Sequence, residues 1–102
     1  MIINVIYYDN GIKQKNVDSS DWLKAPNDIL ALTYEANGIK QECYSWGAYF
    51  VIDDFVGGFN SITGFNGNKK KYFPIETFLV DPRVKMGKEL SNAQWDEVRK
   101  II

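Results

Sequence analysis

The sequence predicts an α+β domain, in which an antiparallel β-sheet built from hairpins carries a short plug helix and a C-terminal α-helix. Two Asn-Gly pairs, Asn10-Gly11 and Asn37-Gly38, each separate two strand-like runs. Asn-Gly in such a place is the strongest short-range hairpin signal, because both residues tolerate the positive φ of a type I′ turn. A capping box near the C-terminus predicts the helix. The 102 residues give room for a single domain, residues 1–102, with one core.

The two hairpins contain the same pentapeptide. Asn-Gly-Ile-Lys-Gln occurs at residues 10–14 and again at 37–41. It marks either an internal duplication of a hairpin or two convergent turns, since two copies are too few for a solenoid. The predicted strands of the hairpins are 2–8 with 12–15 and 29–34 with 39–44.

A short helical turn is expected between the hairpins, in residues 18–26. Ser and Asp side chains there are suited to capping a helical turn, and Pro26 blocks its continuation. We expect Trp22 and Leu23 to anchor this turn on the sheet, so that it acts as a structural plug.

The middle of the chain reads as further strands and loops. Residues 49–52 form an apolar run typical of a buried strand, and residues 59–65 alternate like a strand with one apolar face. The stretch 66–71 is the most loop-like of the chain, and 77–80 is expected to be extended.

The last element is the clearest helix. Ser91 and Gln94 form a Ser-x-x-Gln capping box, in which each side chain satisfies a free backbone amide of the first turn. Trp95, Val98 and Ile102 fall on one face, with Ile101 beside it. A helix of roughly ten residues is marginal alone, so Trp95 is expected to dock on the sheet.

Composition bounds the location and the partners. A single cysteine excludes an intrachain disulfide, and a signal peptide and a long apolar stretch are both missing from the sequence, so we expect a cytoplasmic protein that does not cross a membrane. The net charge of −1 disfavours a generic nucleic-acid binder. Acids outnumber bases in residues 18–54 and bases outnumber acids in 55–102, which either steers a charged partner or is an ordinary solvated surface.

The residues needed for most catalysis are missing. The sequence has no histidine, no phosphate-binding Gly-rich loop and no Cys or His cluster for zinc, so we expect no enzyme, no cofactor and no metal site. Cys43, within a predicted strand, is expected to be a buried, inert thiol. Asp53 and Asp54 follow a strand and point to opposite faces if extended, which favours a role in a turn over a shared metal or catalytic site.

Two stretches are candidates for binding. In the first, a run of lysines is followed by aromatic rings, a combination that suits contact with phosphates and stacking on a base or ring. A solvated loop tip is the alternative. The candidate residues of this loop are Lys69, Lys70, Lys71 and Tyr72.

The second stretch holds the rings Tyr44, Trp46 and Tyr49. Tyr44 and Trp46 share one face of their predicted strand with Lys40 and Glu42. Large rings on a charged strand face are suited to anchoring a partner. The alternative is that the register reverses and these rings belong to the core.

Several short motifs resemble a family of small phage and prophage proteins. They are Trp22-x3-Pro26-x-Asp28-Ile29-Leu30, Gly47-Ala48-Tyr49-Phe50, Ile62-x-Gly64, Val84-Lys85-x-Gly87-Lys88 and Ser91-x3-Trp95, within residues 20–100. The chain departs from the pattern at Ile29, where the family would have glycine, and at Ala48, where it would have an acid.

This resemblance implies a context for function and not a mechanism. Small cytoplasmic phage proteins without catalytic groups are often inhibitors of host or defence machinery, and anti-CRISPR-type proteins act by covering a partner's surface. We therefore expect a non-enzymatic binding protein directed at a host or defence protein. One alternative is a sponge for a nucleotide signal, which needs a concave aromatic pocket with cationic rims, formed between the subunits of a homo-oligomer. The other is a structural accessory of the virion or prophage that self-assembles.

Overall fold

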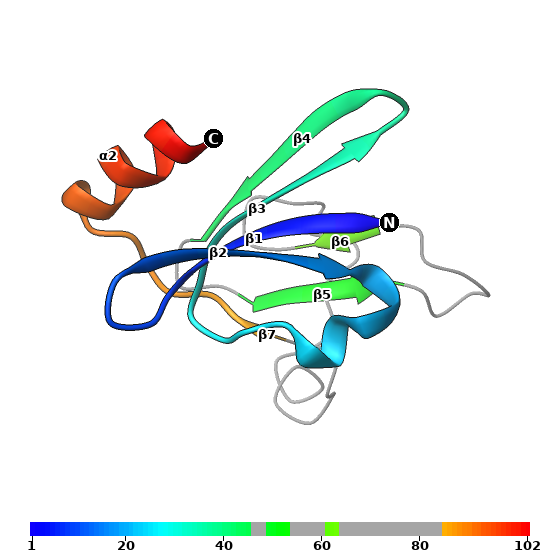
Figure 1. Ribbon diagram of the computed structural model, residues 1–102, viewed down its shortest axis with the longest axis horizontal. Helices are drawn as coiled ribbons and strands as arrows, with labels where there is room; N and C mark the ends of the chain where they lie inside the picture. The colour runs from blue at the N-terminus through cyan, green and yellow to red at the C-terminus, as the bar shows by residue number, and fades with distance from the viewer. Residues whose placement is uncertain (46–48, 54–60, 64–84) are drawn as a thin grey trace.

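A computed structural model describes residues 1–45, 49–53, 61–63 and 85–102 (Figure 1). It confirms the α+β class, with a four-stranded antiparallel sheet, a short 3-10 helix and a C-terminal helix. The elements are β1 (Ile2–Tyr8), β2 (Ile12–Asp18), η1 (Ser19–Lys24), β3 (Ile29–Ala36), β4 (Ile39–Tyr44), β5 (Tyr49–Asp53), β6 (Ser61–Thr63), β7 (Lys85–Met86) and α2 (Asn92–Ile101).

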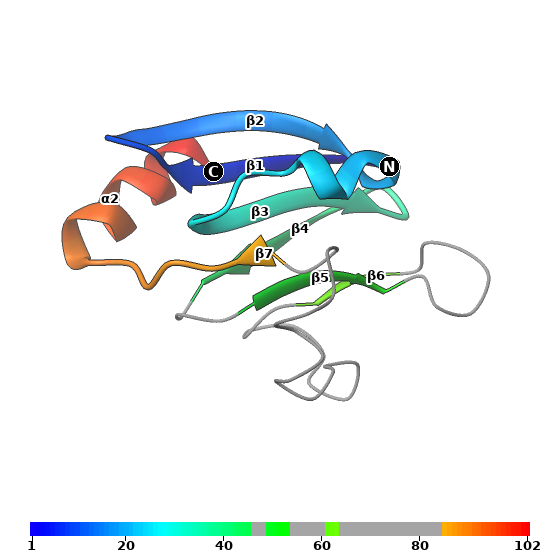
Figure 2. The same ribbon diagram turned by 90° about the horizontal axis from the view of Figure 1, so that it is seen from below.

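The described strands form two sheets. The larger has the order β2-β1-β3-β4 and the smaller the order β6-β5-β7, and every strand pairing is antiparallel. Figure 2 shows the smaller sheet as a second layer beside the larger one. Successive side chains of a strand point to opposite faces, so the larger sheet presents one face to β5 and η1 and the other to α2.

Both predicted hairpins are present, but the repeated pentapeptide makes two different turns. In the second hairpin Ala36 pairs with Ile39 across a two-residue turn, in which Asn37 and Gly38 have φ values of 54° and 76°. In the first hairpin Tyr8 pairs with Ile12, so one more residue lies in the turn.

That extra residue decides which face each side chain occupies. Because side chains alternate, a shift of one residue exchanges the two faces of a strand. Ile12 therefore packs against the cluster under α2, whereas Ile39 lies on the opposite face and is 64% exposed. The two lysines of the pentapeptide, Lys13 and Lys40, are likewise on opposite faces.

A β-bulge in the β1–β3 pairing puts two neighbouring apolar residues, Leu30 and Ala31, on the same face of the larger sheet. The register shifts between Ile6 and Tyr7, so that Ile6 pairs with Ala31 and Tyr7 with Ile29. Leu30 consequently packs with Ala31 in the cluster under α2, while Ile29 packs in the cluster beside β5. Leu30 and Ile29 are both fully buried.

The plug is confirmed as η1. Asp18 caps it, since its Oδ1 accepts hydrogen bonds from the Ser20 amide (3.0 Å) and the Ser20 hydroxyl (2.9 Å). These bonds favour the carboxylate and hold the pKa of Asp18 below its usual value. The prediction that both Trp22 and Leu23 anchor the plug is half wrong. Trp22 is 2% exposed, but Leu23 is 57% exposed because the short turn directs only one of two neighbours at the sheet.

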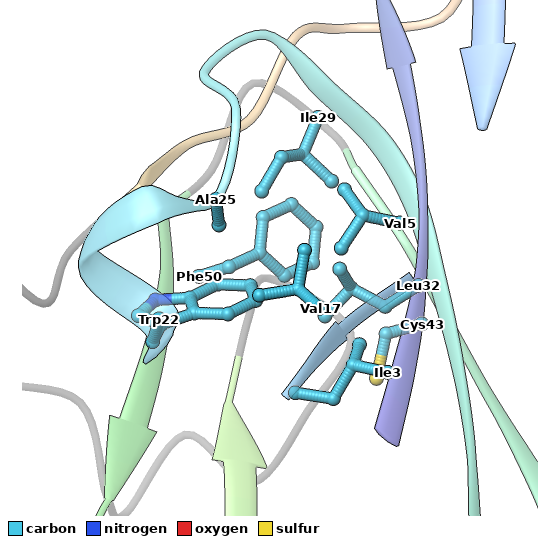
Figure 3. Packing of buried hydrophobic residues seen from close by; sticks show 9 residues of the cluster. All are labelled: Ile3, Val5, Val17, Trp22, Ala25, Ile29, Leu32, Cys43 and Phe50. Carbon is cyan, nitrogen blue, oxygen red and sulfur yellow. The ribbon is translucent and has the colours of Figure 1, made fainter. Parts of the chain in front are cut away.

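Residues of many elements make up the core beside β5. Figure 3 shows Trp22 and Phe50 facing the apolar side chains of the larger sheet. Phe50, fully buried, joins β5 to this cluster. The cluster consists of Ile3, Val5, Val17, Trp22, Ala25, Ile29, Leu32, Cys43 and Phe50.

The C-terminal helix begins and docks as predicted. The backbone amide of Gln94 donates to Ser91 Oγ (3.3 Å), and the backbone amide of Ser91 donates to Gln94 Oε1 (3.0 Å). These two bonds complete the capping box. Val98 is fully buried, and Trp95, Ile101 and Ile102 pack around it against Ile6, Leu30 and Ala31.

Other predictions in the middle of the chain are tested only in part. The strand expected at 49–52 is β5, and β6 lies inside the alternating stretch 59–65. The expected loop 66–71 and the extended segment 77–80 lie outside the described residues.

Candidate functional site

Of the residues predicted to bind, Tyr44 is the one whose side chain the structure describes. Its ring packs on Trp95 of α2, with 4.9 Å between ring centroids and 33° between their planes. The Tyr44 hydroxyl donates to Glu42 Oε2 (2.9 Å). Burial raises the pKa of Tyr44, and the hydrogen bond and charge of Glu42 add to that effect. Half-buried against the helix, Tyr44 helps to dock α2.

Tyr44, Glu42 and Lys40 share one face of β4, as the sequence indicates. Lys40 Nζ donates to the carbonyl oxygen of Ile102 (3.0 Å), so the end of α2 is held above this face. Tyr49 lies in β5 and pairs with Met86. Trp46, Lys69, Lys70, Lys71, Tyr72 and Asp54 lie outside the described residues. A binding role for the rings and the lysines stays a prediction.

The part of this sheet face that α2 leaves uncovered is hollowed into a groove of about 580 Å³. We call it the open groove. It crosses β1, β2, β3 and β4, and its lining includes Ile2, Asn4, Asn16, Thr33, Glu35 and Lys40.

The strand register brings the polar residues of the open groove together. Asn4 of β1 pairs with Asn16 on one side and with Thr33 on the other, so these three form a row across three strands. Glu35 pairs with Lys40 at the β4 side. The side-chain amide of Asn4 donates to Gln14 Oε1 (3.2 Å) of the neighbouring strand β2.

The open groove therefore offers hydrogen-bond donors and acceptors, the carboxylate of Glu35 and the ammonium group of Lys40. Ile2 adds an exposed apolar side chain at its rim. Such a mixture suits a polar occupant that carries charge and some apolar surface. Sequence reasoning missed Asn4, Asn16 and Thr33. The signal that points to Asn4 is its place between the apolar residues Ile3 and Val5, where alternation puts it on the other face.

Cys43 is buried and unpaired with any other cysteine. Burial raises the pKa of its thiol, because the thiolate is disfavoured in apolar surroundings. The expectation of a buried thiol is confirmed, and the neutral form explains why it would be unreactive.

Within residues 1–45, 49–53, 61–63 and 85–102, no three His, Cys, Asp or Glu side chains gather in a way that would hold a metal ion. None of the helices in these ranges has the length and apolar content needed to cross a bilayer.

Comparison of the chain with protein-family models, with curated proteins and with solved structures found no match. The resemblance to small phage and prophage proteins thus rests on the sequence motifs alone.

Proposed function

We propose that this protein acts by binding a protein partner in the open groove and inhibits that partner by covering its surface. The observation that carries the proposal is the open groove itself, a hollow across four strands that combines amides, a hydroxyl, both signs of charge and an exposed isoleucine. Protein surfaces that bind one another have this mixed character. In the context that the resemblance implies, the partner is a host or defence protein in the cytoplasm.

The proposal predicts that reversing one groove charge abolishes partner capture. Tagged wild-type protein is used to capture proteins from a nuclease-treated bacterial lysate, and mass spectrometry identifies any stoichiometric partner. Glu35→Arg, within the groove, is expected to weaken capture at least about tenfold, since it places a repulsive charge in the interface. Glu97→Arg makes the same change on the exposed side of α2 and should bind like the wild type.

Two results would contradict this proposal. Equal capture by the Glu35→Arg and Glu97→Arg variants would show that the partner binds elsewhere. Recovery of the chain without any protein partner, although the variants fold normally, would contradict a protein-binding function in that host.

A second candidate function is the capture of a small anionic ligand such as a nucleotide. It is favoured by the volume of the open groove, which falls in the range of about 300–1,000 Å³ typical of small-molecule sites. Lys40 supplies the cation.

This candidate predicts a thermal shift with one member of a nucleotide panel. A ligand at 100 times its dissociation constant adds about 2.7 kcal/mol to the free energy of unfolding, which raises the Tm of a domain this size by roughly 10 °C or more. Lys40→Ala should remove the shift. Lys13→Ala, which changes the same residue of the other pentapeptide copy on the opposite face, should keep it. A panel without any shift would exclude these ligands.

A further inference from the structure

Among the strands that the structure describes, β4 lies at one edge of the larger sheet (Figure 1). The two-residue turn at Asn37-Gly38 makes Ala36 and Ile39 a hydrogen-bonded pair, and such pairs alternate along an antiparallel ladder. Odd-numbered residues of β4 therefore bond to β3, and the hydrogen bond from the Ser45 amide to the Leu30 carbonyl (2.8 Å) continues this pattern. The backbone amides and carbonyls of Lys40 and Glu42 consequently point to the outer edge.

The two edges of the larger sheet differ in charge. On β2, the exposed residues Lys13 and Lys15 present like charges, which is a common protection against pairing with another strand. On β4, the exposed residues Lys40 and Glu42 have opposite charges and share a face. The β4 edge is thus the one suited to accept a further strand.

The sequence of β4 matches its own antiparallel copy in one register. A twofold axis through Gln41 places Lys40 of each copy opposite Glu42 of the other, with their outward backbone groups in hydrogen-bonding pairs. An axis through Lys40 would oppose two lysines, and an axis through Glu42 would oppose two glutamates. Opposite charges across strands stabilise a pairing, and like charges destabilise it.

We propose that the protein forms a homodimer in which β4 pairs with β4 of a second copy about a twofold axis at Gln41. The larger sheet then continues through both copies as eight strands. Ile39, which is 64% exposed in one copy, lies beside Cys43 of the other copy on the face away from α2. Because Lys40 also lines the open groove, the two grooves come to lie next to each other. The homodimer does not depend on a partner in the open groove.

The test is a charge exchange read by sedimentation velocity. The wild type is expected to dimerise with a dissociation constant of roughly 100 µM or below. The single variants Lys40→Glu and Glu42→Lys are each expected to raise this dissociation constant at least about tenfold. The double variant Lys40→Glu/Glu42→Lys restores both opposite-charge pairs and should dimerise like the wild type. Lys13→Glu, on the β2 edge, should leave the dimer intact.

A cross-link checks the register in folded protein. Gln41 faces Gln41 of the second copy as a non-hydrogen-bonded pair, where side chains approach closely enough for a disulfide. Gln41→Cys is expected to form a covalent dimer on mild oxidation, whereas Lys15→Cys should not. A monomeric wild type would overturn the proposal. So would a double variant that fails to dimerise although it folds, or a Gln41→Cys dimer that does not cross-link.

Discussion

Replacing Trp22 by alanine is expected to lower the free energy of unfolding by about 3–5 kcal/mol, the range typical of truncating a large buried aromatic ring. Trp22 is 2% exposed and closes the core between η1, the larger sheet and β5. Alanine would lose the buried apolar area of the indole and leave a cavity that the surrounding strands can fill only in part. Denaturant unfolding followed by circular dichroism measures the change.

The adjacent residue provides a matched control for Trp22. Leu23 is 57% exposed, so Leu23→Ala is expected to change the free energy of unfolding by no more than about 0.5 kcal/mol. Comparable losses for the two variants would mean that η1 is not anchored through the indole ring. Equal slopes of the unfolding transition with denaturant would show that the two variants unfold from similarly compact states.

The second large effect is expected for Phe50→Ala, at about 3–5 kcal/mol. Phe50 is fully buried and is the residue of β5 that packs in the cluster with Trp22 and Ile29. Its loss should loosen β5 first, so that amide hydrogens of β5 exchange faster while those of β1, central in the larger sheet, change less. Hydrogen exchange with mass spectrometry resolves the two segments.

Met86→Ala is the control for Phe50→Ala. Met86 pairs with Tyr49 across the β5–β7 ladder, but its side chain is 53% exposed, so its truncation should cost less than about 1 kcal/mol. If Phe50→Ala left both the free energy of unfolding and the exchange of β5 unchanged, the packing of the smaller sheet on the larger one would be contradicted.

Local signals in the sequence predicted the parts of the fold that depend on neighbouring residues. Asn-Gly identified both turns because positive φ is a property of those two residues. Ser91 and Gln94 identified the start of α2 because the capping bonds span three residues. The plug was placed correctly for the same reason, by Asp18 and Pro26. These features need no knowledge of distant contacts.

Features that depend on strand register, or on which element covers a face of the sheet, were not predictable in this way. The pentapeptides are identical, but the turns that contain them differ in length by one residue. That difference puts Lys13 and Lys40 on opposite faces. Tyr44 was expected either exposed or in the core, and it is half-buried because α2, more than forty residues later, covers one end of its face. The open groove combines residues of four strands, which no local pattern of Asn4 or Thr33 reveals.

The order of elements also has a consequence for synthesis on the ribosome. All four strands of the larger sheet lie within the first 44 residues, whereas α2 begins at Asn92. The sheet can therefore pair while its face at Ile6, Leu30 and Ala31 still lacks its cover. Until α2 emerges, the nascent chain carries an apolar surface open to chaperones or to other nascent chains. Truncation before α2 would make that transient exposure permanent.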